Sequence, residues 1–359
     1  MNTKISKKGF SSIIYFITQV MFLRVGSTRI LNSASNGSIY SLVTGTIISL
    51  ILLFPLLKLF NYEKELSLFE KIEKLYGKTI GNIINLFLVI IFMLFFIYLL
   101  WSLNSYVQDK YLDQTPSLII LILFIIPVLW CGSLNMKVLA KVSLSLFIIS
   151  IFMIIFSASN LVMYIDFDNF KPLFDTSFFL IIKNALIFSA YFITPTFMLL
   201  ITPKSMIYNS KNLDKTIIKF YLLSAINYTL IFIFVIGIFG IDLAKIFSYP
   251  EYSLMKKINY FDFIQHVENI ATIQFLYCLF ISNVMSIVFI KEYLKYKKIY
   301  KNSLFFIISF ICLFISLNLF DNTTIGYNFI KKYYIFIYSI PLLVIVILSC
   351  IVIKIKKLS

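Results

Sequence analysis

The sequence predicts an all-α integral membrane protein, a single polytopic domain (1–359) with about ten transmembrane helices. Hydrophobic residues occupy 60% of the 359 positions, and the mean hydropathy is +0.93. A helix needs about 20 apolar residues to cross a bilayer. Continuous apolar runs such as 86–100 indicate helices rather than the short alternating strands of a barrel. The expected spans are 10–24, 38–60, 80–107, 117–134, 140–165, 177–201, 216–240, 264–292, 302–320 and 333–353.

The charge distribution predicts the orientation of the chain. The net charge is +16, with 32 Lys and Arg against 16 Asp and Glu. In a soluble protein this excess would indicate nucleic acid. Here the basic residues lie in loops, so we expect no nucleic-acid partner and a lipid bilayer as the surroundings. Most lysines fall on one side if the N-terminus is cytoplasmic, so the positive-inside rule predicts both termini in the cytoplasm.

Several classes of function are poorly supported. The four cysteines form no close pair and the only histidine is His266, so we expect no metal site, no cofactor and no enzyme activity. No acid lies at the centre of a span, which argues against a proton-driven pump. Lysines before the first apolar run also fit a cleaved signal peptide, but nine further spans make that reading unnecessary.

The first expected span runs into a polar stretch that contains glycine. Glycine beside hydroxyl residues lets a helix unwind and offer backbone N–H groups to a ligand carboxylate. Gly26, Ser27 and Thr28 are therefore candidate ligand-binding residues; a glycine kink without a ligand is the alternative. Arg24 is either a functional charge within the span or a side chain that reaches the surface.

The loop at 61–78 and the third span each carry a further prediction. Glutamates and lysines alternate at helical spacing in the loop, which predicts a short amphipathic surface helix. Tyr98 lies near the middle of the third span, where a tyrosine hydroxyl needs a partner. It is a candidate ligand contact, and a hydrogen bond between helices is the alternative.

The sixth span is the second irregular one. Pro195 removes a helix hydrogen bond and disfavours helix at Thr194, which would free carbonyl groups for a ligand ammonium. Ser189, Tyr191 and Thr194 are candidates there, with a packed proline kink as the alternative. Of the ten expected spans, the first and the sixth are irregular. This pattern predicts a five-plus-five inverted repeat, with repeat one at about 10–165 and repeat two at about 177–353.

The longest outer connection, 241–263, is too polar to span the membrane and too apolar for a flexible linker. We expect a structured outer cap there, around Tyr249 and Pro250.

These segments resemble the membrane-embedded B subunit of spore germinant receptors, in the amino acid–polyamine–organocation (APC) transporter superfamily. The similarity covers nearly the whole chain. Lys256 stands where arginine is usual, and Gln265 and His266 where a Glu-Arg pair is usual. The matching segments are 19–29, 68–78, 132–141 and the outer motif with Tyr249, Pro250, Ser253, Lys256 and Glu268.

The resemblance implies a LeuT-like fold whose third span lines the ligand site, which favours Tyr98 as a ligand contact. It also implies a sensor of small nutrients, usually amino acids, in the spore inner membrane, with A and C subunits as partners. An amino-acid permease or exchanger with the same pocket is the alternative function. A membrane acyl- or glycosyltransferase is a third, disfavoured because no His, Asp or Glu cluster is visible.

Overall fold

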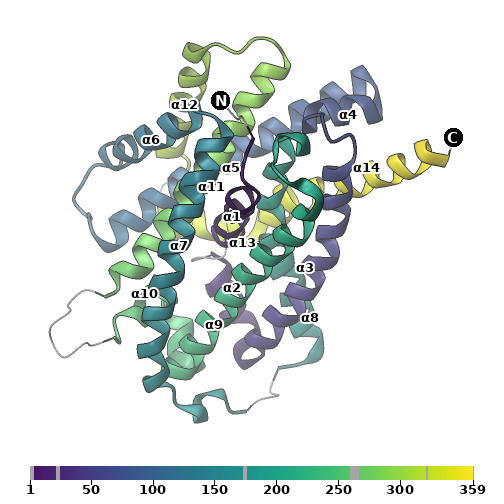
Figure 1. The fold of residues 1–359 in the computed structure, drawn as a ribbon. Helices are drawn as coiled ribbons and strands as arrows, with labels where there is room; N and C mark the ends of the chain where they lie inside the picture. Colours follow the sequence, from purple (N-terminus) through teal and green to yellow (C-terminus); the bar gives the residue numbers. More distant parts are fainter. Residues whose placement is uncertain (1–3, 22–24, 173–175, 259–266, 321, 359) are drawn as a thin grey trace.

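The computed structural model describes residues 4–21, 25–172, 176–258, 267–320 and 322–358, and these residues are overwhelmingly helical (Figure 1). Seven helical segments in this part of the chain are long and apolar enough to cross a membrane. Two shorter apolar helices, Ser117–Ser133 and Asn302–Leu317, accompany them. The expected multi-pass, all-α membrane class is therefore confirmed.

Each of the ten apolar runs contains a helix, and four described helices, α2, α4, α10 and α13, lie between runs. The first half comprises α1 (Lys7–Gln19), α2 (Ser27–Ala34), α3 (Ser38–Asn61), α4 (Leu68–Tyr76), α5 (Lys78–Lys110), α6 (Ser117–Ser133) and α7 (Met136–Leu161). The second half comprises α8 (Phe178–Ile193) with a 3-10 segment (Thr194–Ile201), α9 (Leu213–Ile246), α10 (Pro250–Met255), α11 (Asn269–Tyr296), α12 (Asn302–Leu317), α13 (Thr323–Tyr334), a π-helical turn (Ile335–Ser339) and α14 (Ile340–Leu358).

The two short surface helices mark opposite faces of the bundle, which we call the α4 face and the α10 face (Figure 1). At the α4 face, Ile5 forms a parallel bridge with Ile207, just before α9 begins. The Nζ of Lys356 donates to the carbonyl of Lys74 at 2.9 Å, so the C-terminal helix also ends at this face. Both ends of the chain thus lie at the α4 face.

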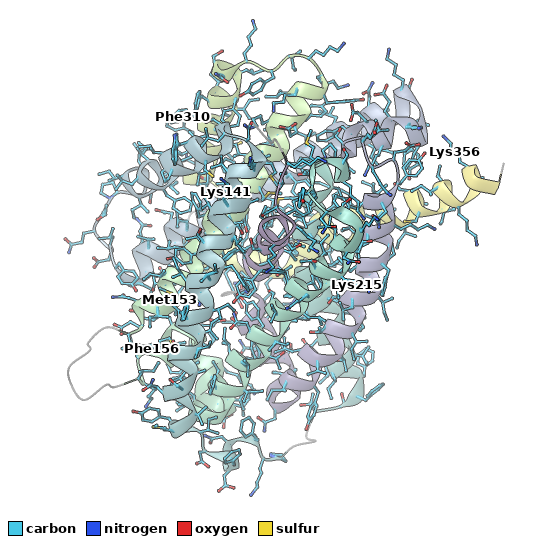
Figure 2. The ribbon with its side chains drawn as sticks, viewed as in Figure 1. Lys141, Met153, Phe156, Lys215, Phe310 and Lys356 are labelled. Carbon is cyan, nitrogen blue, oxygen red and sulfur yellow. The ribbon has the colours of Figure 1, made fainter. Side chains whose placement is uncertain are left out.

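The centre of the bundle is built from α1 and α8. Helix α1 packs against α7, α9 and α11, and its residues 9–19 are all buried. Helix α8 packs most extensively against α3, and α5 packs against α11 and α12. Outward-facing aromatic side chains such as Phe156 on α7 and Phe310 on α12 are exposed, as expected of a surface that meets lipid (Figure 2).

The sequence accounts for the local geometry of α4 and α9. Helix α4 begins with a capping box, in which the backbone N–H of Ser67 donates to Glu70 at 2.7 Å, and its apolar face is buried. This confirms the expected amphipathic surface helix. Helix α9 is interrupted at Gly240, whose φ of 67° and ψ of 168° are open to glycine but strained for other residues. The interruption redirects the chain toward α10.

Candidate ligand site at the break of the first helix

The first expected span is broken, as its sequence predicts. Helix α1 ends at Gln19 and α2 begins only at Ser27. Gly26 itself has φ −71° and ψ −45°, an ordinary right-handed helical conformation. Val25 and Gly26 together have π-helical geometry, so the glycine is not unwound in the way that its sequence predicts. Arg24 lies outside the described residues.

Three consecutive residues at the start of α2 contact three different elements. The Ser27 hydroxyl donates to the carboxylate of Glu251 on α10. The Thr28 hydroxyl lies 2.5 Å from the hydroxyl of Tyr327 on α13. The guanidinium of Arg29 donates to the hydroxyl of Tyr191 on α8 at 2.8 Å. A shift of α2 would therefore disturb α8, α10 and α13 together.

The sixth expected span also breaks where its proline predicts. Helix α8 ends at Ile193, and a 3-10 segment with Pro195 near its start follows. The Thr194 hydroxyl bonds the carbonyl of Ala190 at 2.6 Å and lies 2.8 Å from the hydroxyl of Ser339. Ser189 donates within its own helix, to the carbonyl of Leu186 at 2.8 Å. Thr194 is therefore joined to another span, whereas the bond of Ser189 is local.

Tyrosines gather where α8 meets the end of α13. The ring of Tyr191 lies 4.6 Å from that of Tyr334, which lies 5.0 Å from that of Tyr338. Tyr98 on α5 lies near both Tyr334 and Tyr338. Tyr191 and Tyr334 are fully buried and Tyr98 is 3% exposed. Tyr98, Tyr191 and Thr194 are thus brought to one packed region, next to α2.

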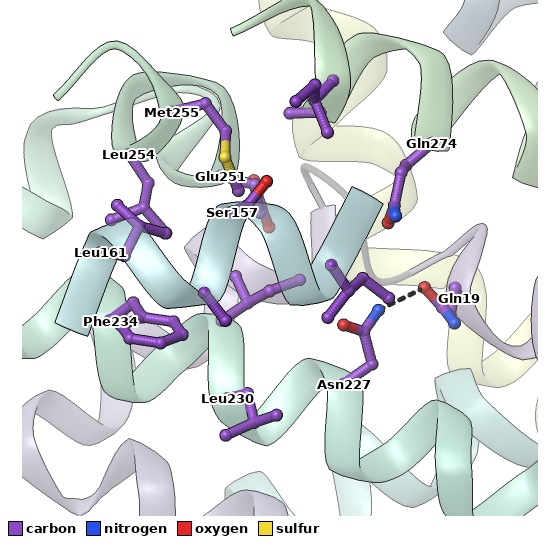
Figure 3. A pocket seen from close by; sticks show the side chains of 15 residues that line it. Gln19, Ser157, Leu161, Asn227, Leu230, Phe234, Glu251, Leu254, Met255 and Gln274 are labelled. Atoms are coloured by element: carbon purple, nitrogen blue, oxygen red, sulfur yellow. Dashed lines mark hydrogen bonds between the residues drawn. The ribbon is translucent and has the colours of Figure 1, made fainter. Parts of the chain in front are cut away.

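A cavity of about 60 Å³ lies on the other side of the break (Figure 3). Its walls come from the end of α1 and from α7, α9, α10 and α11, and they are mostly apolar. Four polar side chains with a carboxylate or an amide also line it: Gln19, Asn227, Glu251 and Gln274. The side-chain N–H of Asn227 donates to the side-chain oxygen of Gln19 at 3.1 Å, so α9 is tied to the end of α1.

Glu251 is the ionisable side chain that lines this cavity. It is 6% exposed, and one of its carboxylate oxygens has no hydrogen-bond partner in the described part of the chain. Burial raises its pKa to about 7, and the hydrogen bond from Ser27 opposes part of that rise. The carboxyl group therefore changes its charge near neutral pH, instead of near pH 4.5.

Sequence reasoning did not select these four side chains. Glu251 follows Pro250 of the outer motif, but the sequence analysis does not select it as a site residue. A usable signal was the spacing of Glu251, Leu254 and Met255, which places them on one face of a helix, and all three line the cavity. Amides within apolar spans, such as Gln19 and Asn227, were the other available signal.

The outer motif forms α10 and its attachments. Pro250 is the first residue of α10, and the buried Tyr249 before it donates to a carboxylate oxygen of Asp109 on α5 at 3.0 Å. Ser253 is half-buried. The Nζ of Lys256 lies 5.0 Å from the ring centre of Tyr252. The remaining motif residue, Glu268, is half-buried and directly precedes α11, whereas Gln265 and His266 lie outside the described residues.

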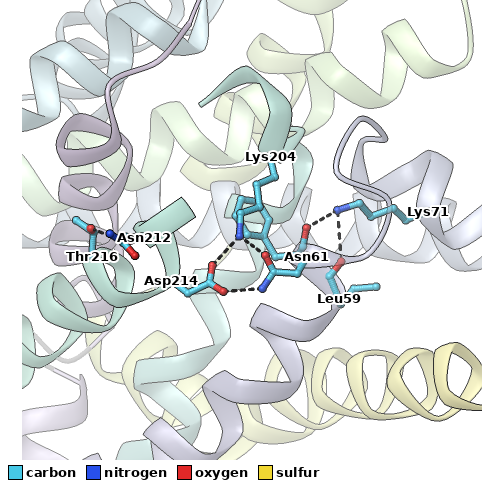
Figure 4. A network of polar contacts seen from close by, with 8 residues as sticks. Leu59, Asn61, Lys71, Lys204, Asn212, Asp214 and Thr216 are labelled. Carbon is cyan, nitrogen blue, oxygen red and sulfur yellow. Dashed lines mark hydrogen bonds and ion pairs between the residues drawn. The ribbon is translucent and has the colours of Figure 1, made fainter. Parts of the chain in front are cut away.

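A separate network of polar contacts lies at the α4 face (Figure 4). The Nζ of Lys204 lies 3.0 Å from the Asp214 carboxylate and also donates to the side-chain oxygen of Asn61. Asn61 donates back to Asp214 at 2.6 Å. The Nζ of Lys71 donates to the last carbonyl groups of α3, at 2.8 Å for Phe60. Burial lowers the pKa of Lys71 to about 8, and nearby Lys204 adds to that effect.

The fold defines the class of the protein: a multi-pass, all-α integral membrane protein. The structure is similar to crystal structures of two variants of a manganese transporter from Eremococcus coleocola, with TM-scores of 0.53 and 0.52 at 13% and 12% identity. Each similarity covers 97% of this chain and 85% of the transporter. At such low identity the similarity establishes the fold alone.

The spore germination protein family model matches residues 4–325. The chain therefore belongs to the spore germination protein family, as its sequence predicts. No curated protein matches it. In the described part of the chain, no three His, Cys, Asp or Glu side chains gather in a way that could hold a metal ion.

Proposed function

We propose that this protein is the nutrient-sensing membrane subunit of a spore germinant receptor. It binds a small germinant, an amino acid, where the first helix is broken, and passes the signal to A and C subunits in the spore inner membrane. The observation that carries the proposal is the start of α2, where Ser27, Thr28 and Arg29 contact α10, α13 and α8. A ligand that displaces α2 would shift the balance between two arrangements of these helices.

The proposed architecture is a LeuT-like five-plus-five inverted repeat with both termini in the cytoplasm. Its support is that contacts between helices recur when each helix of one half is replaced by its counterpart in the other half. In this repeat α1, α3, α5, α6 and α7 correspond in order to α8, α9, α11, α12 and α14. The contact α1–α9 then corresponds to α8–α3, the contact α1–α7 to that of α8 with the π-helical turn before α14, and the contact α6–α11 to α12–α5. The pairs α5–α11, α3–α9 and α6–α12 become themselves. All of these pairs are in contact, as a twofold internal repeat requires.

The site proposed for the ligand includes Gly26, Ser27, Thr28, Tyr98, Ser189, Tyr191 and Thr194, next to the cavity with Glu251. The N–H groups at the start of α2 suit the carboxylate of an amino acid. The tyrosine cluster beside Tyr191 suits its apolar part. The outer motif residues Tyr249, Pro250, Ser253, Lys256 and Glu268 belong to the proposed cap, which gates access to the site or contacts a partner subunit.

Germination assays on spores that lack the native gene and carry a variant copy test the proposal. We expect Gly26→Leu to abolish the response to an amino-acid mixture without reducing the amount of protein in the membrane, because leucine fills space next to the α2 N–H groups. Gly26→Ala is the matched control, since the helical backbone at this position tolerates alanine. A normal response of Gly26→Leu would place the pocket elsewhere.

Transport is the second candidate function, and the transporter fold of the structural neighbours favours it. Uptake of radiolabelled amino acids into vesicles separates the two functions. A receptor subunit gives no uptake above empty vesicles and co-purifies with two partner subunits. Saturable uptake by the protein alone would instead assign it as a permease or exchanger.

A further inference from the structure

The cavity beside α10 combines apolar walls with a buried carboxylate. Glu251 is only 6% exposed, and one of its carboxylate oxygens has no hydrogen-bond partner among the described residues. A buried charge without a partner is costly, and proteins normally pair it. The space beside it is large enough for a small group and is not filled by the chain itself.

We propose that this cavity binds the primary ammonium group of a small aliphatic amine ligand, with Glu251 as its counter-ion. The inference rests on the proposed function, and it specifies which group of the ligand the protein recognises. It differs from the expectation that carbonyl groups around 189–194 hold the ammonium. In the structure one of those carbonyls, that of Ala190, already accepts a hydrogen bond from the hydroxyl of Thr194 at 2.6 Å.

The other polar groups of the cavity suit a cation as well. Gln274 donates its side-chain N–H to the carbonyl of Ser150 at 3.0 Å, which leaves its side-chain oxygen as an acceptor. Asn227 uses its N–H on Gln19 in the same way. An ammonium group has three donors and no acceptor, so a carboxylate and two amide oxygens complement it.

The apolar walls distinguish an alkylammonium from an inorganic cation. Leu161, Leu230, Phe234, Leu254 and Met255 line the cavity with the polar groups. An alkali ion prefers several oxygen ligands and gains nothing from these side chains, whereas the methylene groups of an amine are stabilised by contact with them.

The charge state of Glu251 gives the proposal a pH signature. A bound cation favours the ionised carboxylate, and protonation competes with binding. With a pKa of about 7, the ionised fraction falls about tenfold between pH 8 and pH 6. Affinity for an alkylammonium should fall by about the same factor, because the amine itself stays protonated over this range.

Thermal unfolding of the full-length protein in lipid nanodiscs, with n-propylamine as the probe, tests the proposal. We expect a saturable rise in the unfolding temperature with n-propylamine, and none with 1-propanol or propionate, which share its apolar body. Glu251→Gln should weaken binding at least tenfold. The matched control is Asp242→Asn, which removes an exposed acid at the end of α9 outside the cavity.

Three results would overturn the proposal: equal stabilisation by 1-propanol, binding to Glu251→Gln as tight as to the wild type, or the same Glu251-dependent shift with sodium or potassium chloride alone. If Glu251→Gln fails to fold, the affinity of the wild-type protein for n-propylamine is measured at pH 6 and at pH 8 instead. An unchanged affinity between these pH values contradicts the proposal. Suppose that the spores respond to amino acids although n-propylamine does not raise the unfolding temperature of the purified protein. That pair of results would refute this inference and leave the proposed sensing function intact.

Discussion

Lys71 shows how one side chain can join two helices of a membrane protein. It comes from α4, is fully buried, and places its ammonium group on the carbonyl end of α3, where the helix dipole is negative. The like charge of nearby Lys204 opposes the charged form of Lys71. The expected amphipathic helix is therefore also an internal anchor.

The lowered pKa of Lys71 makes a pH-dependent contribution to stability. The folded protein releases this proton near pH 8, whereas an unfolded lysine keeps it to about pH 10.5. Because the unfolded state binds more protons in that window, stability relative to Lys71→Met should increase as the pH rises from 8 to 10.5, by at most about 3 kcal/mol. Unfolding in detergent at a series of pH values measures it. A constant difference between the two proteins would show that Lys71 titrates normally.

Tyr191 tests the coupling between α2 and α8 at the level of a single hydroxyl. Tyr191→Phe removes the acceptor of the Arg29 bond and keeps the ring against Tyr334. A hydrogen bond of this kind contributes about 1 kcal/mol, so we expect the germinant concentration for half-maximal response to change about fivefold at unchanged protein abundance. Thr229→Val is the control, because that hydroxyl bonds only within α9 in the described structure. An unchanged threshold in Tyr191→Phe would exclude this coupling.

At the scale of elements, the close approach of α3 and α8 depends on Gly45. A Cβ atom there would lie 2.7 Å from the backbone oxygen of Ala185 and 2.7 Å from the ring of Phe188. Gly45→Ala should therefore destabilise the protein by about 1–3 kcal/mol, because a backbone atom cannot move aside cheaply. Val43→Ala is the matched control on the same helix, since the Val43 side chain is exposed on the outer surface of α3. Equal unfolding temperatures of the two variants would contradict this account.

Helix α10 is the element on which the gating hypothesis depends. Tyr249→Ala removes the bond to Asp109, and Pro250→Ala loosens the first turn of the helix. If α10 gates access to the site, both variants keep normal abundance and change the germinant threshold. Lys257→Ala, at an exposed position of the same segment, serves as the control. Unchanged thresholds at normal abundance would rule gating out, and loss of protein in both variants would favour a role in folding or assembly.

The sequence was a good guide to elements and a poor guide to contacts between them. Hydropathy located the apolar runs, and Pro195 and the polar stretch that begins at Arg24 pointed to the two irregular spans, because these signals are local. The meeting of Tyr98, Tyr191 and Thr194 at α13 depends on how helices far apart in the chain are rotated and aligned. The same is true of Glu251 in its cavity, since local patterns do not specify which face of α10 turns inward.

At the scale of the whole molecule, the orientation in the membrane is the next test. Lys8 and Lys356 are both exposed at the α4 face, where we expect cytoplasm. Lys8→Cys and Lys356→Cys should resist an impermeant thiol reagent added outside intact cells. Asp168→Cys, in the connection that follows α7, should react and serves as the positive control. Labelling of either α4-face cysteine from outside would refute the orientation.

The position of α1 has a consequence for how the protein is made. This helix has 13 residues and is tied by hydroxyl and amide groups to α7 and α9, for example through Ser12 to Ser143 and Thr18 to Ser224. Those partners lie more than a hundred residues further along the chain, so α1 is made well before the side chains that it bonds. It is also short for a bilayer. A chain that ends before residue 213 would therefore lack α9, and α1 would have no Ser224 hydroxyl to meet Thr18.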